Sequence, residues 1–136
     1  MSKRTISLSL LLICAAVMAF AGVIRDGSLI GISNGSVIIV RWYSEDESGV
    51  NKVELERASG TDGQFILLND IPLRGNNQAY EYIDDSAFRV TEALYRYRLK
   101  VGFSNGNPPV YYGPITIRHD VNSVRRTWGS IKAMFR

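Results

Sequence analysis

The chain has 136 residues and a formal net charge of +3, and 46% of its residues are hydrophobic. This length accommodates one domain, and the balance of apolar, charged and glycine residues excludes wholesale disorder. Two of the cations, Lys3 and Arg4, lie in an N-terminal leader, which leaves only +1 on the rest of the chain. A net charge this close to zero does not indicate the basic surface that binds nucleic acid, so no nucleic-acid partner is expected.

The leader, residues 1–21, has the parts of a secretory signal peptide. Its two cations precede an uncharged run from Ile6 to Phe20, and Ala19-Phe20-Ala21 offers small residues at the two positions that a signal peptidase reads. We expect cleavage after Ala21 and a secreted, periplasmic or cell-surface location. The alternative is an uncleaved anchor, because the apolar character continues to Ile24. Cys14 is the only cysteine, so the mature domain is expected to hold no disulfide.

From residue 22 to residue 119, short apolar runs alternate with turn residues, a pattern typical of an all-β sandwich or barrel. Pro72 favours an edge position for the strand that it follows. In the last strand, alternation places Tyr111, Ile115 and Ile117 on one face. Seven strands are expected: Ser28–Ile32, Val37–Trp42, Val50–Arg57, Phe65–Leu68, Gln78–Ile83, Leu94–Val101 and Val110–Arg118.

Several short motifs together resemble a fibronectin type III module of the kind found in exported bacterial surface proteins. In chain order they are Trp42, VELER at Val53–Arg57, DGQF at Asp62–Phe65, Tyr80-Glu81-Tyr82 with Asp84, and YRYRLK at Tyr95–Lys100. The resemblance implies a seven-stranded immunoglobulin-like sandwich in which the first, second and fifth strands form one sheet. It also implies that Trp42 and Tyr95 lie in the core, with Tyr95 as the tyrosine corner. Such sandwiches serve many roles, so the resemblance does not fix a function.

The strand Leu94–Val101 has two unlike faces. Tyr95, Tyr97 and Leu99, which we expect to face the core, alternate with three cations, Arg96, Arg98 and Lys100. The implied topology sets these cations across from Glu54 and Glu56, which predicts a charge ladder worth roughly 0.2–1 kcal/mol for each opposite pair. The alternative is a docking face for an acidic partner. The residues of that face would be Arg96, Arg98, Lys100 and Tyr112, with Thr116 and Arg118 beside them.

Nothing in the sequence has the pattern of a catalytic or metal site. His119 is the only histidine, and it is interpreted as a surface residue at the end of the last strand. The carboxylates at Glu45–Glu47 and Asp84-Asp85 lack the surroundings of a glycosidase pair. The loop Ser44–Gly49 could offer oxygen ligands to calcium, but it lacks EF-hand spacing, so a solvated acidic loop is expected. We therefore expect no enzyme, no metal and no cofactor.

The tail, residues 120–136, is basic and amphipathic. Its apolar residues recur at spacings of 3, 4, 3 and 4, which predicts one stripe on a short helix. The stripe consists of Val121, Val124, Trp128, Ile131 and Phe135, and the cations beside it are Arg125, Arg126 and Lys132. Such a helix is marginal alone in water and must pack on something. It could fold back on the sandwich, lie in an anionic membrane interface, or dock in a partner's groove.

Together these patterns predict an exported, non-catalytic interaction or structural module. We expect its tail to dock to a protein partner in a larger envelope or cell-surface assembly, so that truncation after Asp120 releases it. One alternative is a peripheral membrane protein held by the basic tail. Another is a carbohydrate-binding accessory module, which would need an exposed planar row of aromatic rings on one sheet.

Overall fold

A computed structural model gives the fold, and it describes residues 22–89 and 92–120. The expected leader and the expected tail stripe at 121–136 lie outside the described residues. The described elements are β1 (Ile30–Ser33), β2 (Ile38–Tyr43), β3 (Val50–Ser59), β4 (Ile66–Ile71), β5 (Ala79–Asp84), the 3-10 helix η1 (Ser86–Arg89), β6 (Glu92–Phe103) and β7 (Val110–Asp120). Each of the seven expected strands is confirmed, with bounds that differ by a few residues.

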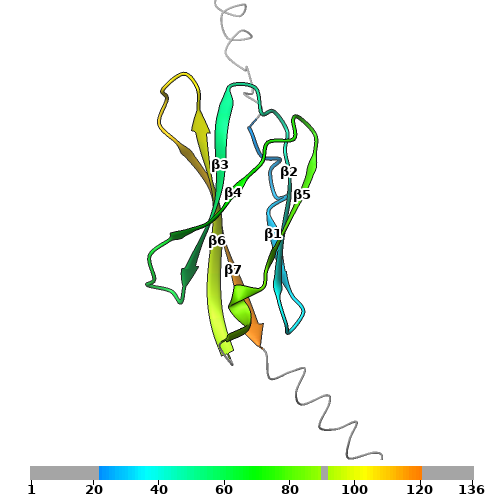
Figure 1. Ribbon diagram of the computed structural model, residues 1–136, viewed down its shortest axis with the longest axis vertical. Coiled ribbons are helices and arrows are strands. Elements are labelled where there is room, and N and C mark those ends of the chain that lie inside the picture. Colours follow the sequence, from blue (N-terminus) through cyan, green and yellow to red (C-terminus); the bar gives the residue numbers. More distant parts are fainter. Residues whose placement is uncertain (1–21, 90–91, 121–136) are drawn as a thin grey trace, which may run out of the picture.

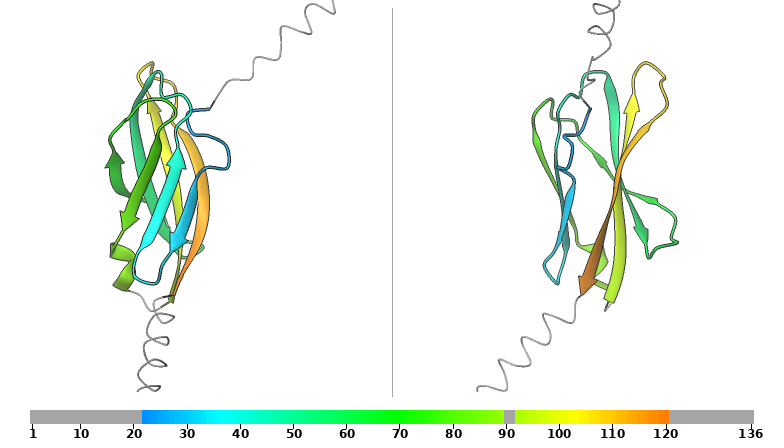
Figure 2. Two further views of the ribbon diagram at one scale, coloured as in Figure 1. Left: turned by 90° about the vertical axis from the view of Figure 1, so that its right-hand side faces the viewer. Right: turned by 180° about the vertical axis from the view of Figure 1, so that it is seen from behind.

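The strands form two antiparallel sheets that pack as layers of a β-sandwich (Figure 1). The three-stranded sheet has the order β1-β2-β5, and the four-stranded sheet has the order β4-β3-β6-β7. The expected grouping of the first, second and fifth strands is confirmed, and β4 is an edge strand as Pro72 predicted. The left panel of Figure 2 faces the outside of the three-stranded sheet and shows β7 beside β1.

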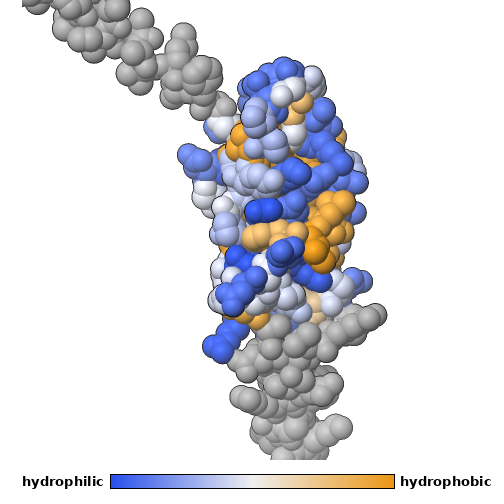
Figure 3. Space-filling model, turned by 90° about the vertical axis from the view of Figure 1, so that its left-hand side faces the viewer, coloured by the Kyte–Doolittle hydropathy of each residue, from blue (hydrophilic) through white to orange (hydrophobic). Residues whose placement is uncertain are grey.

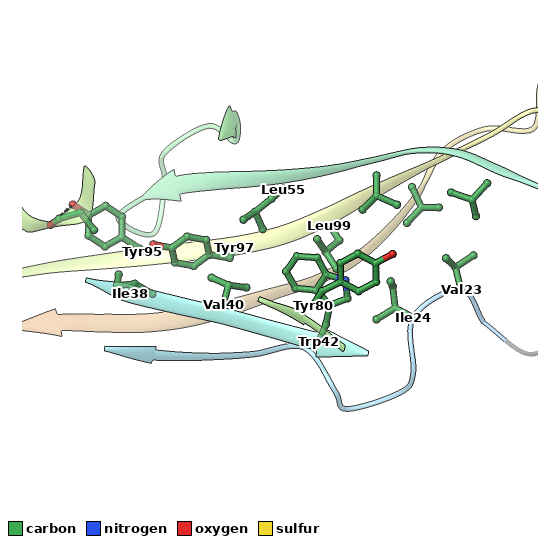
Figure 4. Close-up of a cluster of buried hydrophobic side chains, with 14 residues drawn as sticks. Val23, Ile24, Ile38, Val40, Trp42, Leu55, Tyr80, Tyr95, Tyr97 and Leu99 are labelled. Carbon is green, nitrogen blue, oxygen red and sulfur yellow. Dashed lines mark hydrogen bonds between the residues drawn. The ribbon is translucent and has the colours of Figure 1, made fainter. Parts of the chain in front are cut away.

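The core lies between the sheets and is built from the inward face of each strand (Figure 4). The rings of Trp42 and Tyr80 stack, with centroids 5.3 Å apart and planes 4° from parallel. Tyr95, Tyr97 and Leu99 project from β6 into the same cluster. Complete burial of one aliphatic side chain contributes about 1.5–3 kcal/mol, so this cluster is the main source of stability. The expected core positions of Trp42 and Tyr95 are confirmed.

A β-bulge in β7 overturns the predicted alternation of that strand. Tyr97 pairs with Ile115, but Leu99 pairs with Tyr112, so β7 contains one residue more than β6 between these two pairs. Gly113 lies in the bulge with a φ of 98°, a conformation that glycine adopts easily. As a result Tyr112 packs against the core, and Tyr111 lies on the outer face. The prediction that Tyr112 lies on the outer, cationic face is therefore wrong.

The interpretation of His119 as a surface residue is also wrong, because its side chain is completely buried. β7 runs beside β1 at the edge of the sandwich, and the Nδ1 atom of His119 lies 2.6 Å from the Oγ atom of Ser33. Among the described residues, no group forms a hydrogen bond with its Nε2 atom. Gly31 permits this close approach, since a Cβ atom there would lie 2.6 Å from the side chain of Ile117.

The segment before β1 also belongs to the sandwich, which the strand pattern did not indicate. Val23 and Ile24 are buried members of the core cluster. The backbone N–H of Val23 donates a 3.0 Å hydrogen bond to the hydroxyl of Tyr112, and the N–H of Glu45 donates to the carbonyl of Val23 at 2.7 Å. The packing therefore begins within two residues of Gly22.

Candidate interaction surface

The outer face of the four-stranded sheet holds the cations of β6. The register pairs Lys100 with Glu54 and Arg98 with Glu56, so the expected neighbours across β3 and β6 are confirmed. Arg96 pairs instead with Ala58. The three cations therefore have different neighbours and form different contacts.

Arg98 is held between two aromatic rings and a carboxylate. Its Nε atom donates a 2.5 Å hydrogen bond to Oε2 of Glu56. Its guanidinium carbon lies 4.0 Å from the ring centroid of Phe65 and 4.3 Å from that of Tyr111. Cation–π contacts of this kind contribute about 0.5–1 kcal/mol each at exposed sites. The contacts fix the direction of the guanidinium, so this part of the surface is preorganised.

Arg96 supports the turn between β3 and β4. Its Nε and Nη2 atoms donate to the carbonyls of Gly60 and Gly63, at 3.0 and 2.7 Å. Its guanidinium also lies over the ring of Phe65, 4.9 Å from the centroid. Arg96 therefore positions Phe65, which in turn contacts Arg98, and its charge is already engaged within the domain.

Lys100 differs from the other two cations because its acidic neighbour is engaged elsewhere. The carboxylate of Glu54 forms an ion pair of 2.5 Å with Lys52, which also lies 3.7 Å from Asp70. Among the described residues, no ion pair includes Lys100. Lys100 lines an open depression of about 270 Å³, together with Phe103 and other residues of β3, β6 and the β6–β7 loop.

Exposed apolar side chains border this charged region. Ile66 and Leu67, on the edge strand β4, are 57% and 53% exposed. Leu67 pairs with Glu56 in the register, and Glu56 pairs with Arg98 on its other side, so Leu67 lies on the outer face across Glu56 from Arg98. Figure 3, which views this side of the molecule, shows apolar surface gathered beside hydrophilic surface. The face thus combines exposed hydrocarbon, a fixed arginine–aromatic cluster and an ammonium group that forms no ion pair with the described residues.

We call this set the sheet-face cluster: Phe65, Leu67, Arg98, Lys100 and Tyr111. Two of its members, Arg98 and Lys100, belong to the face predicted from the sequence. Phe65 and Tyr111 were not predicted there: Phe65 was expected to begin a strand but stands just before β4, and Tyr111 is moved outward by the bulge. The predicted tail residues Val121, Val124, Arg125, Arg126, Trp128, Ile131, Lys132 and Phe135 lie outside the described residues.

Aromatic rings on this face do not form the flat row that a carbohydrate-binding module would present. Arg98 covers one face of Phe65 and one face of Tyr111. On the other sheet, exposed Tyr43 has the guanidinium of Arg25 over its ring at 5.0 Å. Each of these three rings therefore already has an arginine over one of its faces.

A second polar cluster lies inside the sandwich. The carboxylate of Asp84 accepts hydrogen bonds from Nη1 of Arg57 at 2.6 Å, the hydroxyl of Tyr97 at 2.6 Å and the hydroxyl of Ser86 at 2.7 Å. Burial acts to raise the pKa of Asp84, but these donors outweigh burial, so its pKa is lowered. Burial and the contact with Asp84 raise the pKa of Tyr97. Every acceptor has a donor, so the cluster is a structural element.

The acidic loop Ser44–Gly49, which was predicted to be solvated, is exposed at Ser48 and Gly49 but is tied to the neighbouring strands through Glu47. Glu47 accepts a short hydrogen bond from the hydroxyl of Tyr80 and another from the N–H of Gly75 at 3.3 Å. Burial, followed by the hydrogen bond to Glu47, raises the pKa of Tyr80 to about 12. Asp46 accepts from the N–H of Ser48 at 2.9 Å. In the described part of the chain, no group of three His, Cys, Asp or Glu residues could hold a metal ion.

These observations define a seven-stranded all-β protein of two packed sheets, with a mixed apolar and cationic surface on the larger one. Comparison of the chain with protein-family models, with curated proteins and with solved structures found no match in any of the three. No helix within residues 22–89 and 92–120 has the length and apolar character needed to cross a membrane.

Proposed function

We propose that this chain is an exported, non-catalytic interaction module of the fibronectin type III-like class, bound to a protein partner in an envelope or cell-surface assembly. The class is supported by the 3+4 grouping of the strands and by the central position of Trp42. It is also supported by Tyr95, whose buried hydroxyl lies 3.5 Å from the carbonyl of Ala87, in the manner of a tyrosine corner.

Export is supported by the charged start, apolar run and small-residue site of the leader. Cleavage after Ala21 would leave the whole described sandwich intact, because its packing begins at Val23. The described part of the chain contains no cysteine, so its fold needs no oxidation step after export.

The observation that carries the binding proposal is the sheet-face cluster. Arginine and tyrosine are enriched among the residues that dominate binding energy at protein interfaces. Here Arg98 and Tyr111 are already held in place by one another, so little conformational freedom is lost when a partner binds. Among the described residues Lys100 has no ion pair, and Leu67 is exposed, so a partner that offers both a carboxylate and an apolar side chain complements this face.

Charge reversal of Lys100 tests this proposal in the envelope where the protein resides. Chemical crosslinking of the full chain, with mass spectrometry of the adduct, identifies the partner. The Lys100→Glu variant should lose that adduct, whereas Arg25→Glu, the same change of charge in the segment before β1 that contacts Tyr43 of the other sheet, should keep it. If Lys100→Glu retains the adduct at the wild-type level, the sheet-face cluster is not the binding site.

Truncation after Asp120 separates this proposal from attachment through the tail. Binding through the sheet-face cluster predicts that the truncated chain still forms the adduct. Loss of the adduct on truncation, with Lys100→Glu unaffected, would favour docking through the tail. Co-sedimentation of the full chain with anionic liposomes, but not of the truncated chain, would favour the membrane-bound alternative.

A further inference from the structure

The outer face of the three-stranded sheet carries an uncovered apolar row. Ile39 pairs with Ile32 on one side and with Ile83 on the other, so the three side chains lie in line across β1, β2 and β5. Ile32 is 42% exposed and Ile83 is 53% exposed. Antiparallel sheets that face water present polar residues on the open side. A row of three isoleucines there therefore indicates a surface that something covers.

The apolar row occupies only one end of the sheet. The next pair on the same face of β2 and β5 after Ile39 and Ile83 is Arg41 and Glu81. These two side chains form an ion pair of 2.7 Å, so that part of the surface is polar. The isoleucine row is at the end where β1 finishes and β2 starts, which is also where β7 finishes (Figure 2, left). Whatever covers the row must therefore reach this end of the sandwich.

β7, the last described strand, ends at Asp120 at this same end of the sandwich. His119 lies 2.6 Å from Ser33 through its side chain, and Ser33 follows directly after Ile32. Consecutive Cα atoms are about 3.8 Å apart, so the residues after Asp120 begin within a few residue lengths of the row. Sixteen residues, 121–136, follow this point in the sequence.

We propose that residues 121–136 cover the isoleucine row of their own domain. The expected stripe of the segment, which includes Val124, Trp128 and Ile131, supplies a matching apolar surface. A helix of this length spans about 24 Å. Three strands span about 10 Å, so such a helix is long enough to cross the row. Packing against it also supplies the tertiary contacts that a short helix needs in water.

Charge favours this occupant over an unrelated apolar segment. Arg125 and Lys132 are seven residues apart, which places both on the same flank of a helix. The sheet face beside the isoleucine row holds the exposed carboxylates of Glu81 and Asp85. In the described part of the chain, Asp85 has no ion pair. A basic flank next to Asp85 is favourable, whereas the carboxylate of Glu81 is already paired with Arg41.

Paired cysteines test the contact directly. The full chain is expressed with its own leader and with Cys14→Ser, and it carries Ile131→Cys together with Ile83→Cys. The matched control carries Ile131→Cys together with Ile66→Cys, since Ile66 is similarly exposed, 57% against 53% for Ile83, but lies on β4. The proposal predicts that the first pair forms an intramolecular disulfide under mild oxidation, seen as a faster-migrating monomer band on a non-reducing gel. The control should not form that band.

Trp128 provides a second readout that does not require a new bond. In the otherwise unchanged chain, Ile83→Lys should shift the tryptophan emission to longer wavelength, and Ile66→Lys should leave it unchanged. The shift should be absent in a Trp128→Phe background, which leaves only the buried Trp42 to emit. A disulfide that forms only between two chains would show that a second copy covers the row, and would overturn the proposal. An emission that is insensitive to Ile83→Lys and shifts only with anionic vesicles would overturn it in favour of a membrane surface.

Discussion

The hydroxyl of Tyr97 donates a 2.6 Å hydrogen bond to Oδ2 of Asp84 in the interior of the sandwich. Tyr97 comes from the four-stranded sheet and Asp84 from the three-stranded one, so this bond joins the two layers. Asp84 is 1% exposed and also forms an ion pair of 2.6 Å with Arg57. Removal of one partner from a buried ion pair destabilises a protein by about 3–5 kcal/mol.

This cluster predicts a loss of stability in acid. The pKa of Asp84 is lower in the folded protein than its unfolded value of about 3.9. The unfolded chain therefore binds more protons in that range, and stability falls as the pH drops below about 4 through the folded pKa. Denaturant unfolding between pH 7 and pH 2 measures this dependence. Asp84→Asn should flatten it, whereas Asp85→Asn, a change at the exposed neighbour, should not.

Gly31 should not tolerate a side chain. Gly31→Ala brings a Cβ atom against Ile117, and such overpacking costs about 1–3 kcal/mol. Ile117→Val removes one of the two atoms in the clash and alone costs about 0.5–1.5 kcal/mol. The double variant should therefore be more stable than the sum of the single effects. Strict additivity in urea unfolding would show that β1 does not pack on Ile117 in this way.

Arg98 should resist replacement by lysine more than Arg41 does. Arg98→Lys loses the flat contacts with Phe65 and Tyr111 and should cost about 1–2 kcal/mol of unfolding free energy. Arg41→Lys alters an ion pair that is half exposed and should cost less than about 0.5 kcal/mol. Equal losses in thermal unfolding would contradict the assignment of Arg98 as the fixed centre of the sheet-face cluster.

Alternation along the chain predicts the strands and their inward faces because it depends only on neighbouring residues. It predicted Tyr97 and Leu99 in the core. It could not predict that Gly113 would add a residue to β7 and exchange the faces of Tyr111 and Tyr112. Such a bulge is fixed by the pairing of distant strands, which the local pattern does not contain.

Side-chain hydrogen bonds across the fold were the other feature that local patterns missed. Glu47 is a charged residue in a Gly- and Ser-containing loop, and only the folded chain brings Tyr80 to it. His119 was interpreted as exposed because it ends a strand, yet Gly31 lets β1 approach closely enough to bury it. In the candidate site, the sequence pattern predicted the cations Arg98 and Lys100. The aromatic partners of Arg98 could be identified only from the tertiary structure.

Site-specific photo-crosslinking tests the proposed binding face most directly. A benzoylphenylalanine residue replaces Tyr111 in one full-length variant and Tyr43 in another, and the two positions are 45% and 46% exposed on opposite sheets. Illumination in the native envelope should attach one defined protein to the Tyr111 variant and leave the Tyr43 variant unattached. Adducts at Tyr43 alone, or the same adduct at equal yield from both positions, would contradict binding through the four-stranded sheet.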